Sequence, residues 1–337
     1  MPRSTPRVPG RALAVMALVL ATLTTACGPG ATAGPSAHQL EQGSLARDFD
    51  LKGARLTVGS KEFTEQQILG KILLYALRAA GARTSDQTGL NGTNVVRQAL
   101  KQGQVDIYWE YSGTGWTQFL QHDRPIRGAQ EQFRATARED HAKNGVTWLA
   151  PARFGNQYAL ARAKDASGAA GEVHTLSDLA EFTRNHPEQA TLCGASEFLD
   201  RELRSFQKTY GARFPPEQTY QNALALNYVN VAKASPCRFA EVFTSDARIT
   251  SLDLEVLEDD RAHFTTELAA VTVRDRTAAE HPQLKALAEK LGDALTEERM
   301  IELNGMVDLE GHTPDEAALA FLSEQGFIGT GASAGDT

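Results

Sequence analysis

The sequence predicts an α/β protein with a largely parallel sheet, divided into two lobes that are interleaved along the chain. Three observations support this prediction. Short apolar segments typical of strands alternate with amphipathic helical segments along most of the chain. The 337 residues and 42% hydrophobic content are sufficient for two lobes with cores of their own. No long linker interrupts the body, so the two lobes cannot be joined by a single tether.

The first 26 residues read as a secretory signal peptide. Three arginines precede the apolar run Ala12–Leu23, which is too short to span a membrane. Small residues then lead to Cys27, as at a lipoprotein cleavage site, where the cysteine becomes an acylated N-terminus. The alternative is a secreted protein with an incidental cysteine. Because Gly28–Ser44 is rich in Gly, Ala, Pro and Ser, we predict a lipidated flexible tether over residues 27–50.

The sequence of residues 55–109 predicts a strand, two helices and a second strand. Ile68, Leu69, Ile72, Leu73, Ala76 and Leu77 fall on one helical face behind the sequence Thr64–Gln67, which has the pattern of a capping box. The expected elements are a strand at 55–59, a helix from Thr64 that stops at Gly81, a helix around 95–100 closed by Gly103, and a strand at 105–109.

The rest of the body continues the alternation. The expected helices are at 130–144, at 176–185 behind a Thr175 cap, and at 197–207. The expected strands are at 158–162, 190–193, 238–243, 254–257 and 268–274. Three helices then end near Gly326, and residues 329–337 are predicted to be a loose tail.

Charge and motifs exclude several functional classes. Without the first 26 residues, 31 basic residues face 42 acidic ones, a net charge of −11. Such an acidic body argues against nucleic acid and anionic membrane surfaces as partners. The histidines are scattered, and the sequence lacks HExxH, CxxC, GxSxG and Walker A motifs. We therefore predict no metal, no cofactor and no enzymatic activity of a familiar kind.

Cys193 and Cys237 are the remaining cysteines, beside two of the expected short strands. We predict a disulfide between them, because export would bring them into an oxidising compartment where such bonds persist. The alternative is two buried free thiols.

The stretch DIYWEYSGTGW, Asp106–Trp116, gathers four aromatic residues, although only 7% of the chain is aromatic. Strand alternation places Tyr108 and Glu110 on one face, and Trp109 and Tyr111 on the other. Tyr111 ends the strand at a turn, where open α/β sheets bind ligands. We assign Tyr108 and Trp109 to packing.

Two longer stretches, GSKEFTEQ (Gly59–Gln66) and LNGTNVVRQALKQGQVDIYWEYSGTG (Leu90–Gly115), resemble a known family. They are similar to the glycine betaine, carnitine and choline binding proteins of osmoprotectant ABC transporters. The resemblance extends in order from about Leu56 to Phe327. It implies a two-lobed clamp of the type II periplasmic-binding-protein kind, with the ligand cleft between the lobes. We place lobe 1 at 51–155 plus 265–328, and lobe 2 at 156–264.

The ligand class explains the aromatic residues that the resemblance singles out. A quaternary ammonium donates no hydrogen bond but binds aromatic faces, at about 0.5–2 kcal/mol for each contact. The resemblance makes Tyr111 and Tyr158 cage rings and Thr114 a polar contact; the alternative for Tyr111 is a core tyrosine. Asn156 stands where family members commonly have aspartate, which keeps an acceptor but removes a charge.

Three charged residues have two interpretations. Lys61 corresponds to a family lysine that contacts the ligand, or it is exposed to solvent. Glu197 and Arg201 are four residues apart on a predicted helix. They either form a surface ion pair worth about 0.3–0.5 kcal/mol, or face the cleft, where Arg201 would hold a ligand carboxylate.

Two residues depart from the family pattern. Phe243 stands where a cage tyrosine is usual, so the ring face is kept and the hydroxyl is lost. Glu267 falls on the position of the fourth cage tyrosine. If it lines the pocket, a cation should be preferred to glycine betaine; alternatively its loop swings outward and the acid is solvated.

These observations lead us to expect a monomeric solute-binding lipoprotein on the outer face of the cell membrane. It would capture a small cationic or zwitterionic amine and deliver it to an ABC permease with a cytoplasmic ATPase. The alternatives are a receptor for another cationic metabolite or amino-acid derivative, a sensory binding protein, and an enzyme on the same fold. The last would need a nucleophile–base pair or a metal site, and we find neither in the sequence.

Overall fold

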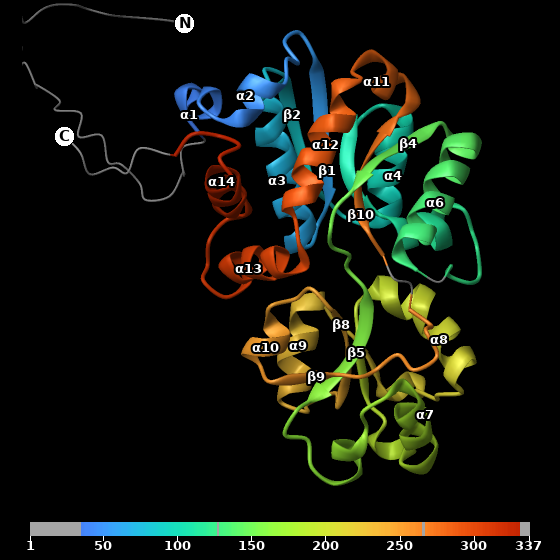
Figure 1. The fold of residues 1–337 in the computed structure, drawn as a ribbon. Coiled ribbons are helices and arrows are strands. Elements are labelled where there is room, and N and C mark those ends of the chain that lie inside the picture. Colours follow the sequence, from blue (N-terminus) through green and yellow to red (C-terminus); the bar gives the residue numbers. More distant parts are fainter. Residues whose placement is uncertain (1–34, 127, 265–266, 331–337) are drawn as a thin grey trace, which may run out of the picture. The chain divides into compact units, whose positions relative to one another are not determined.

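The computed structural model describes residues 35–126, 128–264 and 267–330. The predicted signal peptide, Cys27 and most of the predicted tail lie outside these residues. The described residues form two lobes, each built on a five-stranded sheet (Figure 1). In this part of the chain, no helix combines the length and the apolar character that a membrane span requires.

The sheet of the first lobe has the strand order β2-β1-β3-β10-β4. Its strands are β1 (Arg55–Lys61), β2 (Arg83–Leu90), β3 (Ile107–Tyr111), β4 (Val146–Pro151) and β10 (Ala269–Arg274). β1 runs parallel to β2 and β3, whereas β10 is antiparallel to both β3 and β4.

The sheet of the second lobe repeats this plan in the order β7-β6-β8-β5-β9. Its strands are β5 (Tyr158–Ala163), β6 (Leu192–Gly194), β7 (Thr219–Gln221), β8 (Phe239–Phe243) and β9 (Leu254–Val256). β6 is parallel to β7 and β8, and β5 is antiparallel to β8 and β9. The fourth position of each sheet is therefore held by the strand that arrives from the other lobe, β5 or β10.

The segments that connect the lobes contact each other closely. Residues 152–157 lead from β4 to β5, and residues 257–268 lead back from β9 to β10. Ala152 N donates to Ala269 O at 2.8 Å, and Ala269 N donates to Phe154 O at 3.2 Å. A Cβ atom on Gly155 would lie 1.4 Å from the carbonyl oxygen of Glu267. Only glycine therefore allows the two segments to approach this closely.

Helices cover both faces of the first sheet, because apolar residues line both faces of its strands. One face, with Trp109, packs against residues of α3, α12, α13 and α14; the other, with Tyr108, packs against α4 and α6. The helices of this lobe are α3 (Thr64–Ala79), α4 (Thr93–Gln102), α5 (Ser112–Thr114), η1 (Gly115–Phe119), α6 (Ala129–Asn144), α11 (Asp275–Glu280), α12 (Gln283–Ala294), α13 (Glu297–Asp308) and α14 (Pro314–Glu324).

The second sheet is also covered on both faces, by α7 and α8 on one side and α9 on the other. Its helices are η2 (Gly168–Glu172), α7 (Leu176–Asn185), η3 (Pro187–Gln189), η4 (Phe198–Glu202), α8 (Leu203–Tyr210), η5 (Pro216–Gln218), α9 (Leu224–Ala232) and α10 (Arg248–Ser251). Cys193 and Cys237 form a disulfide on the α9 side, with Cα atoms 5.6 Å apart. The predicted disulfide is therefore confirmed, and the alternative of two buried free thiols is wrong.

The predicted α/β clamp is confirmed, with one reversed strand in each sheet where a largely parallel sheet was expected. The Thr175 cap of α7 is present as a full capping box. The capping box predicted at Thr64 is absent. α3 begins there, but the Thr64 hydroxyl donates to Asp308 at 2.7 Å instead of capping its own helix.

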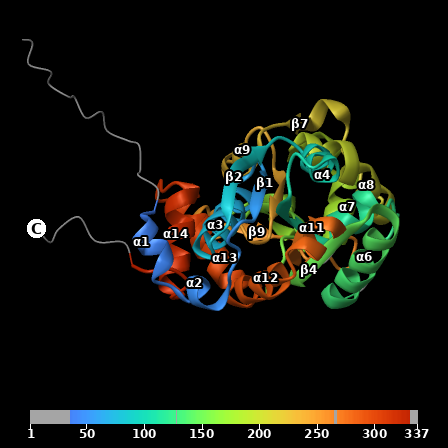
Figure 2. The same ribbon diagram turned by 90° about the horizontal axis from the view of Figure 1, so that it is seen from above.

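The prediction of a flexible tether over 27–50 is wrong for its described part. α1 (Ala37–Glu41) and α2 (Ser44–Asp48) are short helices. They lie beside α14 in both views (Figures 1 and 2). Leu45 is fully buried, and its N–H donates to Phe327 O at 3.1 Å. Several contacts of this segment are with residues more than 200 positions away in the chain, and composition alone does not reveal them. Gly329, predicted to begin the loose tail, donates to Gln39 O at 2.7 Å.

Candidate functional site

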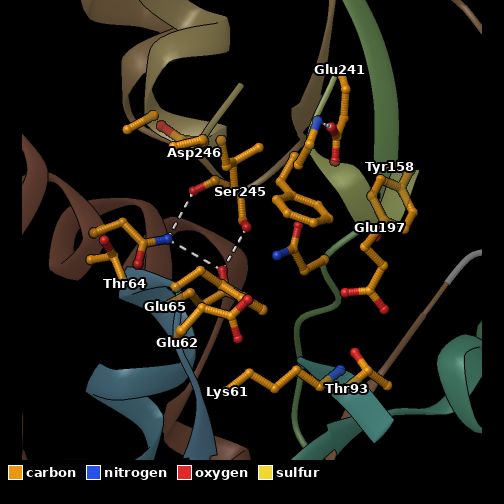
Figure 3. Close-up of a pocket in the computed structure, with 18 of the residues that line it drawn as sticks. Lys61, Glu62, Thr64, Glu65, Thr93, Tyr158, Glu197, Glu241, Ser245 and Asp246 are labelled. Atoms are coloured by element: carbon orange, nitrogen blue, oxygen red, sulfur yellow. Dashed lines mark hydrogen bonds between the residues drawn. The ribbon is translucent and has the colours of Figure 1, made fainter. Parts of the chain in front are cut away.

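A cavity of about 650 Å³ lies between the two lobes. The first lobe contributes Lys61, Phe63, Glu65, Tyr111 and Thr114 to its wall. The second lobe contributes Tyr158, Glu197, Glu241, Phe243 and Ser245. Asn156 and Glu267, from the two connecting segments, also line it. Figure 3 shows Tyr158, Glu197 and Glu241 on one side of this pocket and Glu62 and Glu65 on the other.

Four aromatic rings, two from each lobe, form a continuous series along the cavity. The ring centroids of Tyr158 and Phe243 are 4.8 Å apart, and those of Phe243 and Phe63 are 5.6 Å apart. Phe63 and Tyr111 follow at 6.4 Å. Tyr158 and Phe243 stand opposite each other on paired strands, and Phe63 directly precedes α3. The wall can therefore present several ring faces to a cation.

Tyr111 is held by contacts on both its ring and its hydroxyl. Its hydroxyl donates to Glu65 Oε1 at 2.5 Å, and the Lys61 ammonium lies 5.3 Å from its ring centroid. Lys61 also forms a buried ion pair with Glu110, with Nζ and Oε1 2.7 Å apart. Lys61 is 4% exposed, so the interpretation of a solvent-exposed lysine is wrong. Its charge is already shared between a carboxylate and an aromatic face.

Glu267 lines the main cavity and a small adjoining one. Its Oε2 accepts from the Thr114 hydroxyl at 3.5 Å, the only hydrogen bond that its carboxyl makes among the described residues. Burial raises its pKa well above the usual value; Lys61 opposes this shift, and Glu110 and Glu202 add to it. The interpretation in which Glu267 swings outward into solvent does not describe this structure.

Glu197 and Arg201 form an ion pair, with Oε1 and Nη1 2.8 Å apart. Both side chains keep about a third of their exposure, and both line the small adjoining cavity with Glu202. The two open interpretations are thus combined, because the residues pair with each other and also face the cleft. The pKa of Glu202 is raised by burial.

Glu241 is a buried acid on β8 that the sequence reading did not single out. It is 1% exposed and lines the cavity. Ala195 N donates to its Oε2 at 2.5 Å, and Asn227 Nδ2 donates to the same atom at 3.3 Å. Burial raises the pKa of Glu241 to about 8.

The structure gathers the nine residues predicted for ligand binding around this cleft. Eight line the main cavity, and Arg201 lines the adjoining one. Phe63, Glu65 and Glu241 were missed. Phe63 carries a signal that could have been used, since it is an isolated aromatic residue among the polar residues of KEFTEQ. Cys27 lies outside the described residues.

A metal centre has no support in the part of the chain that the structure describes, where no group of three potential ligands gathers. The unpaired polar atoms of the cavity wall are acceptors instead. Asn156 Oδ1 and Asn304 Oδ1 are buried and have no hydrogen-bond partner among the described residues. Glu197, Glu241 and Glu267 add carboxyl groups to the wall, which therefore suits a ligand that brings positive charge or N–H donors.

A comparison with known families decides the class of this protein. Residues 54–324 match the OpuAC family, described as the substrate binding domain of ABC-type glycine betaine transport systems. The chain belongs to this family. Members are transport proteins that bind a substrate outside the cytoplasm, and the family is not one of enzymes.

Individual relatives agree with this assignment. A glycine-betaine-binding protein of Pseudomonas aeruginosa is 32% identical over 283 residues, which cover 82% of this chain and 89% of that protein. An ergothioneine transport permease/binding protein of Helicobacter pylori is 30% identical over 80% of this chain, but only 48% of that longer protein is covered. A solved structure of a glycine betaine/carnitine/choline ABC transporter has a TM-score of 0.65 and 25% identity, covering 81% of this chain and 99% of that one.

Proposed function

We propose that this OpuAC-family protein captures a small quaternary-amine or other cationic or zwitterionic solute between its lobes. The observation that carries the proposal is the interlobe cavity, where four aromatic rings and several carboxylates converge. A quaternary ammonium is attracted to ring faces and cannot satisfy a hydrogen-bond acceptor. The combination of rings with acids therefore suits a trimethylammonium group, or a cation that also carries N–H groups.

The size of the cavity and the relatives narrow the set of ligands. About 650 Å³ is within the usual range for a small-molecule site. Two relatives are named for glycine betaine and for ergothioneine, which both carry a trimethylammonium group and a carboxylate. Glu267 adds a carboxyl group to the wall, so we expect choline-like or guanidinium-like cations to bind more tightly than glycine betaine.

Calorimetric titration with choline, glycine betaine, carnitine, ergothioneine, arginine and putrescine tests the proposal. Thermal shift on the same panel provides an independent measure, since ligand at 100 times its Kd stabilises a protein by about 2.7 kcal/mol. A Tyr158→Ala variant is the matched control and should lose the response to quaternary amines. Binding of the uncharged or anionic solutes of a wider panel, with no response to any amine, would overturn the proposal.

Delivery to a membrane permease driven by a cytoplasmic ATPase follows from the family. We further propose that the protein acts as a monomer, anchored by a lipid on Cys27 after removal of residues 1–26. The motif before Cys27 supports the anchor. Mass spectrometry of the membrane fraction should find an acylated N-terminal Cys27, and a Cys27→Ser variant should be released from membranes. An unmodified N-terminus at another residue would contradict the anchor.

A further inference from the structure

Glu65 connects one of the aromatic rings to the opposite lobe. This residue lies in the first turn of α3 and is 3% exposed. Its Oε1 accepts a hydrogen bond from the Tyr111 hydroxyl at 2.5 Å. Its Oε2 accepts from Ser245 Oγ at 2.6 Å and from Asn304 Nδ2 at 3.2 Å. Figure 3 shows Glu65 and Ser245 joined in this way. Both carboxyl oxygens are therefore used by protein donors.

These donors belong to different lobes. Tyr111 ends β3 and Asn304 lies in α13, both in the first lobe. Ser245 belongs to the second lobe and follows Phe243, the end of β8 and a ring of the cavity wall, by two residues. Asn304 Nδ2 also donates to the Ser245 carbonyl at 3.1 Å. The first lobe thus holds both the hydroxyl and the backbone of Ser245.

A second interlobe contact lies nearby in the sequence. Arg248 of the second lobe pairs with Asp308 of α13, with Nη2 and Oδ2 3.2 Å apart. Asp308 also accepts the bond from Thr64, the residue just before Glu65. Separating the lobes would break both contacts, and Glu65 would lose a donor that its buried carboxyl cannot easily replace.

The dependence of Glu65 on these donors is strong because it is deeply buried. Burial raises its pKa, and hydrogen bonds from Ser245, Tyr111 and Asn304 oppose that shift. Ser245 is itself 1% exposed. A hydrogen bond between two buried groups that belong to different lobes can exist only when the lobes are closed.

We propose that Glu65 is a positioning residue that couples the Tyr111 ring to lobe closure through Ser245. This inference rests on the proposed function, because Tyr111 is taken to contact the ligand. A ligand that orders the Tyr111 ring also fixes its hydroxyl on Glu65 and so favours the closed arrangement. Closure in turn holds Glu65 and the Tyr111 ring in place, so ligand binding and lobe closure stabilise each other.

A double-mutant cycle on ligand binding tests the coupling. Tyr111→Phe removes the hydroxyl and keeps the ring, and Ser245→Ala removes the donor of the opposite lobe. Ser245→Ala should weaken binding of choline or glycine betaine about fivefold, by faster dissociation rather than slower association. The double variant should lose at least threefold less affinity than the product of the two single losses.

The matched control uses an interlobe contact that does not involve Glu65. Gln118 Nε2 donates to Glu202 Oε1 at 3.4 Å, from the first lobe to the second. Gln118→Ala combined with Tyr111→Phe should be additive to within about twofold. Additive losses of affinity in both cycles would overturn the proposal. They would mean that Ser245→Ala weakens closure in general, without a specific coupling between Ser245 and Tyr111.

A measurement without ligand separates this inference from the proposed function. Fluorophores at Lys101→Cys of α4 and Lys208→Cys of α8 report the distance between the lobes, and both positions are exposed. Ser245→Ala should shift the unliganded protein toward longer distances, whatever the ligand proves to be. An unchanged distance distribution would refute the role of Ser245 in closure, whereas failure of every amine to bind would refute only the ligand class.

Discussion

Replacing Glu267 by glutamine should weaken the binding of choline and leave glycine betaine little changed. Glu267 lines the cavity, and its pKa is raised well above the usual value by burial. This shift favours the protonated form of the carboxyl in the unliganded protein. A bound cation favours the ionised form, so choline should bind with release of this proton. A zwitterion can instead place its own carboxylate against the protonated acid.

The expected magnitude follows from two opposing contributions. A cation about 4 Å from the ionised carboxylate gains about 4 kcal/mol at an effective dielectric constant near 20. Removing the proton costs about 1.4 kcal/mol for each pH unit by which the pKa exceeds the ambient pH. Raising the pH lowers this cost, so choline affinity should increase with pH until the pKa of Glu267 is passed. We expect glutamine to reduce choline affinity, and the loss should grow as the pH is raised; a tenfold loss corresponds to about 1.4 kcal/mol.

Calorimetry at several pH values, in buffers with different ionisation enthalpies, measures both the affinity and the protons released. Glu62→Gln is the matched control, because Glu62 also lines the cavity but lies exposed, with a hydrogen bond to Gly92 N at 3.0 Å. It should leave proton release unchanged. Glu267→Tyr should shift the preference toward glycine betaine. A wild-type protein that binds betaine more tightly, with a betaine-to-choline ratio that neither substitution at 267 alters, would refute the reasoning.

Three further predictions concern the rings, the disulfide and a buried acid. Tyr111→Ala and Tyr158→Ala should each weaken amine binding at least tenfold in titrations; unchanged affinity in both would return these rings to a packing role. Cys193→Ser should lower the free energy of unfolding by roughly 3–4 kcal/mol in chemical denaturation, because the disulfide closes a separation of 44 residues; equal stability of reduced and oxidised protein would contradict this. In the folded state Glu241 has a pKa of about 8, whereas in the unfolded state its pKa is the ordinary value of 4.5. Between these two pH values the folded state binds one more proton than the unfolded state, so the free energy of unfolding should fall as the pH rises from about 4.5 to 8. Glu241→Gln should flatten that slope in unfolding measured across this range, and an unaltered slope would show that Glu241 is not its source.

The residues that could be predicted from sequence are those whose signal is local. Tyr111 could be placed at a ligand site because it ends a strand at a glycine-containing turn, and the structure puts it at the end of β3 on the cavity. The helix at Thr64 was also located correctly, from the apolar spacing that follows it. Regular periodicity and turn residues report on neighbours in the chain, and such neighbours decide where elements begin and end.

Residues whose partners are distant in the chain could not be predicted in this way. β2 is a mostly exposed edge strand without apolar alternation, and its pairing with β1 defines it. Glu65 lies within the local pattern of a helix start, yet its carboxyl accepts a hydrogen bond from Ser245, 180 residues away. Asn304 is 239 residues from Glu65. These contacts depend on how two interleaved lobes meet, and a single sequence contains no local pattern that reports such a meeting.

Glu267, which we expect to select the charge of the ligand, lies on one of the two segments that connect the lobes. This residue belongs to the connecting segment that returns to the first lobe, and its carbonyl lies against Gly155 of the other connecting segment. Its neighbour Leu268 is tied to the first lobe, since Leu268 N donates to Ser112 Oγ at 3.1 Å and Ser112 N donates to Leu268 O at 3.0 Å. The backbone beside Glu267 is therefore tied to the first lobe, whereas the bond from Ser245 to Glu65 joins the two lobes and would be lost if they separated.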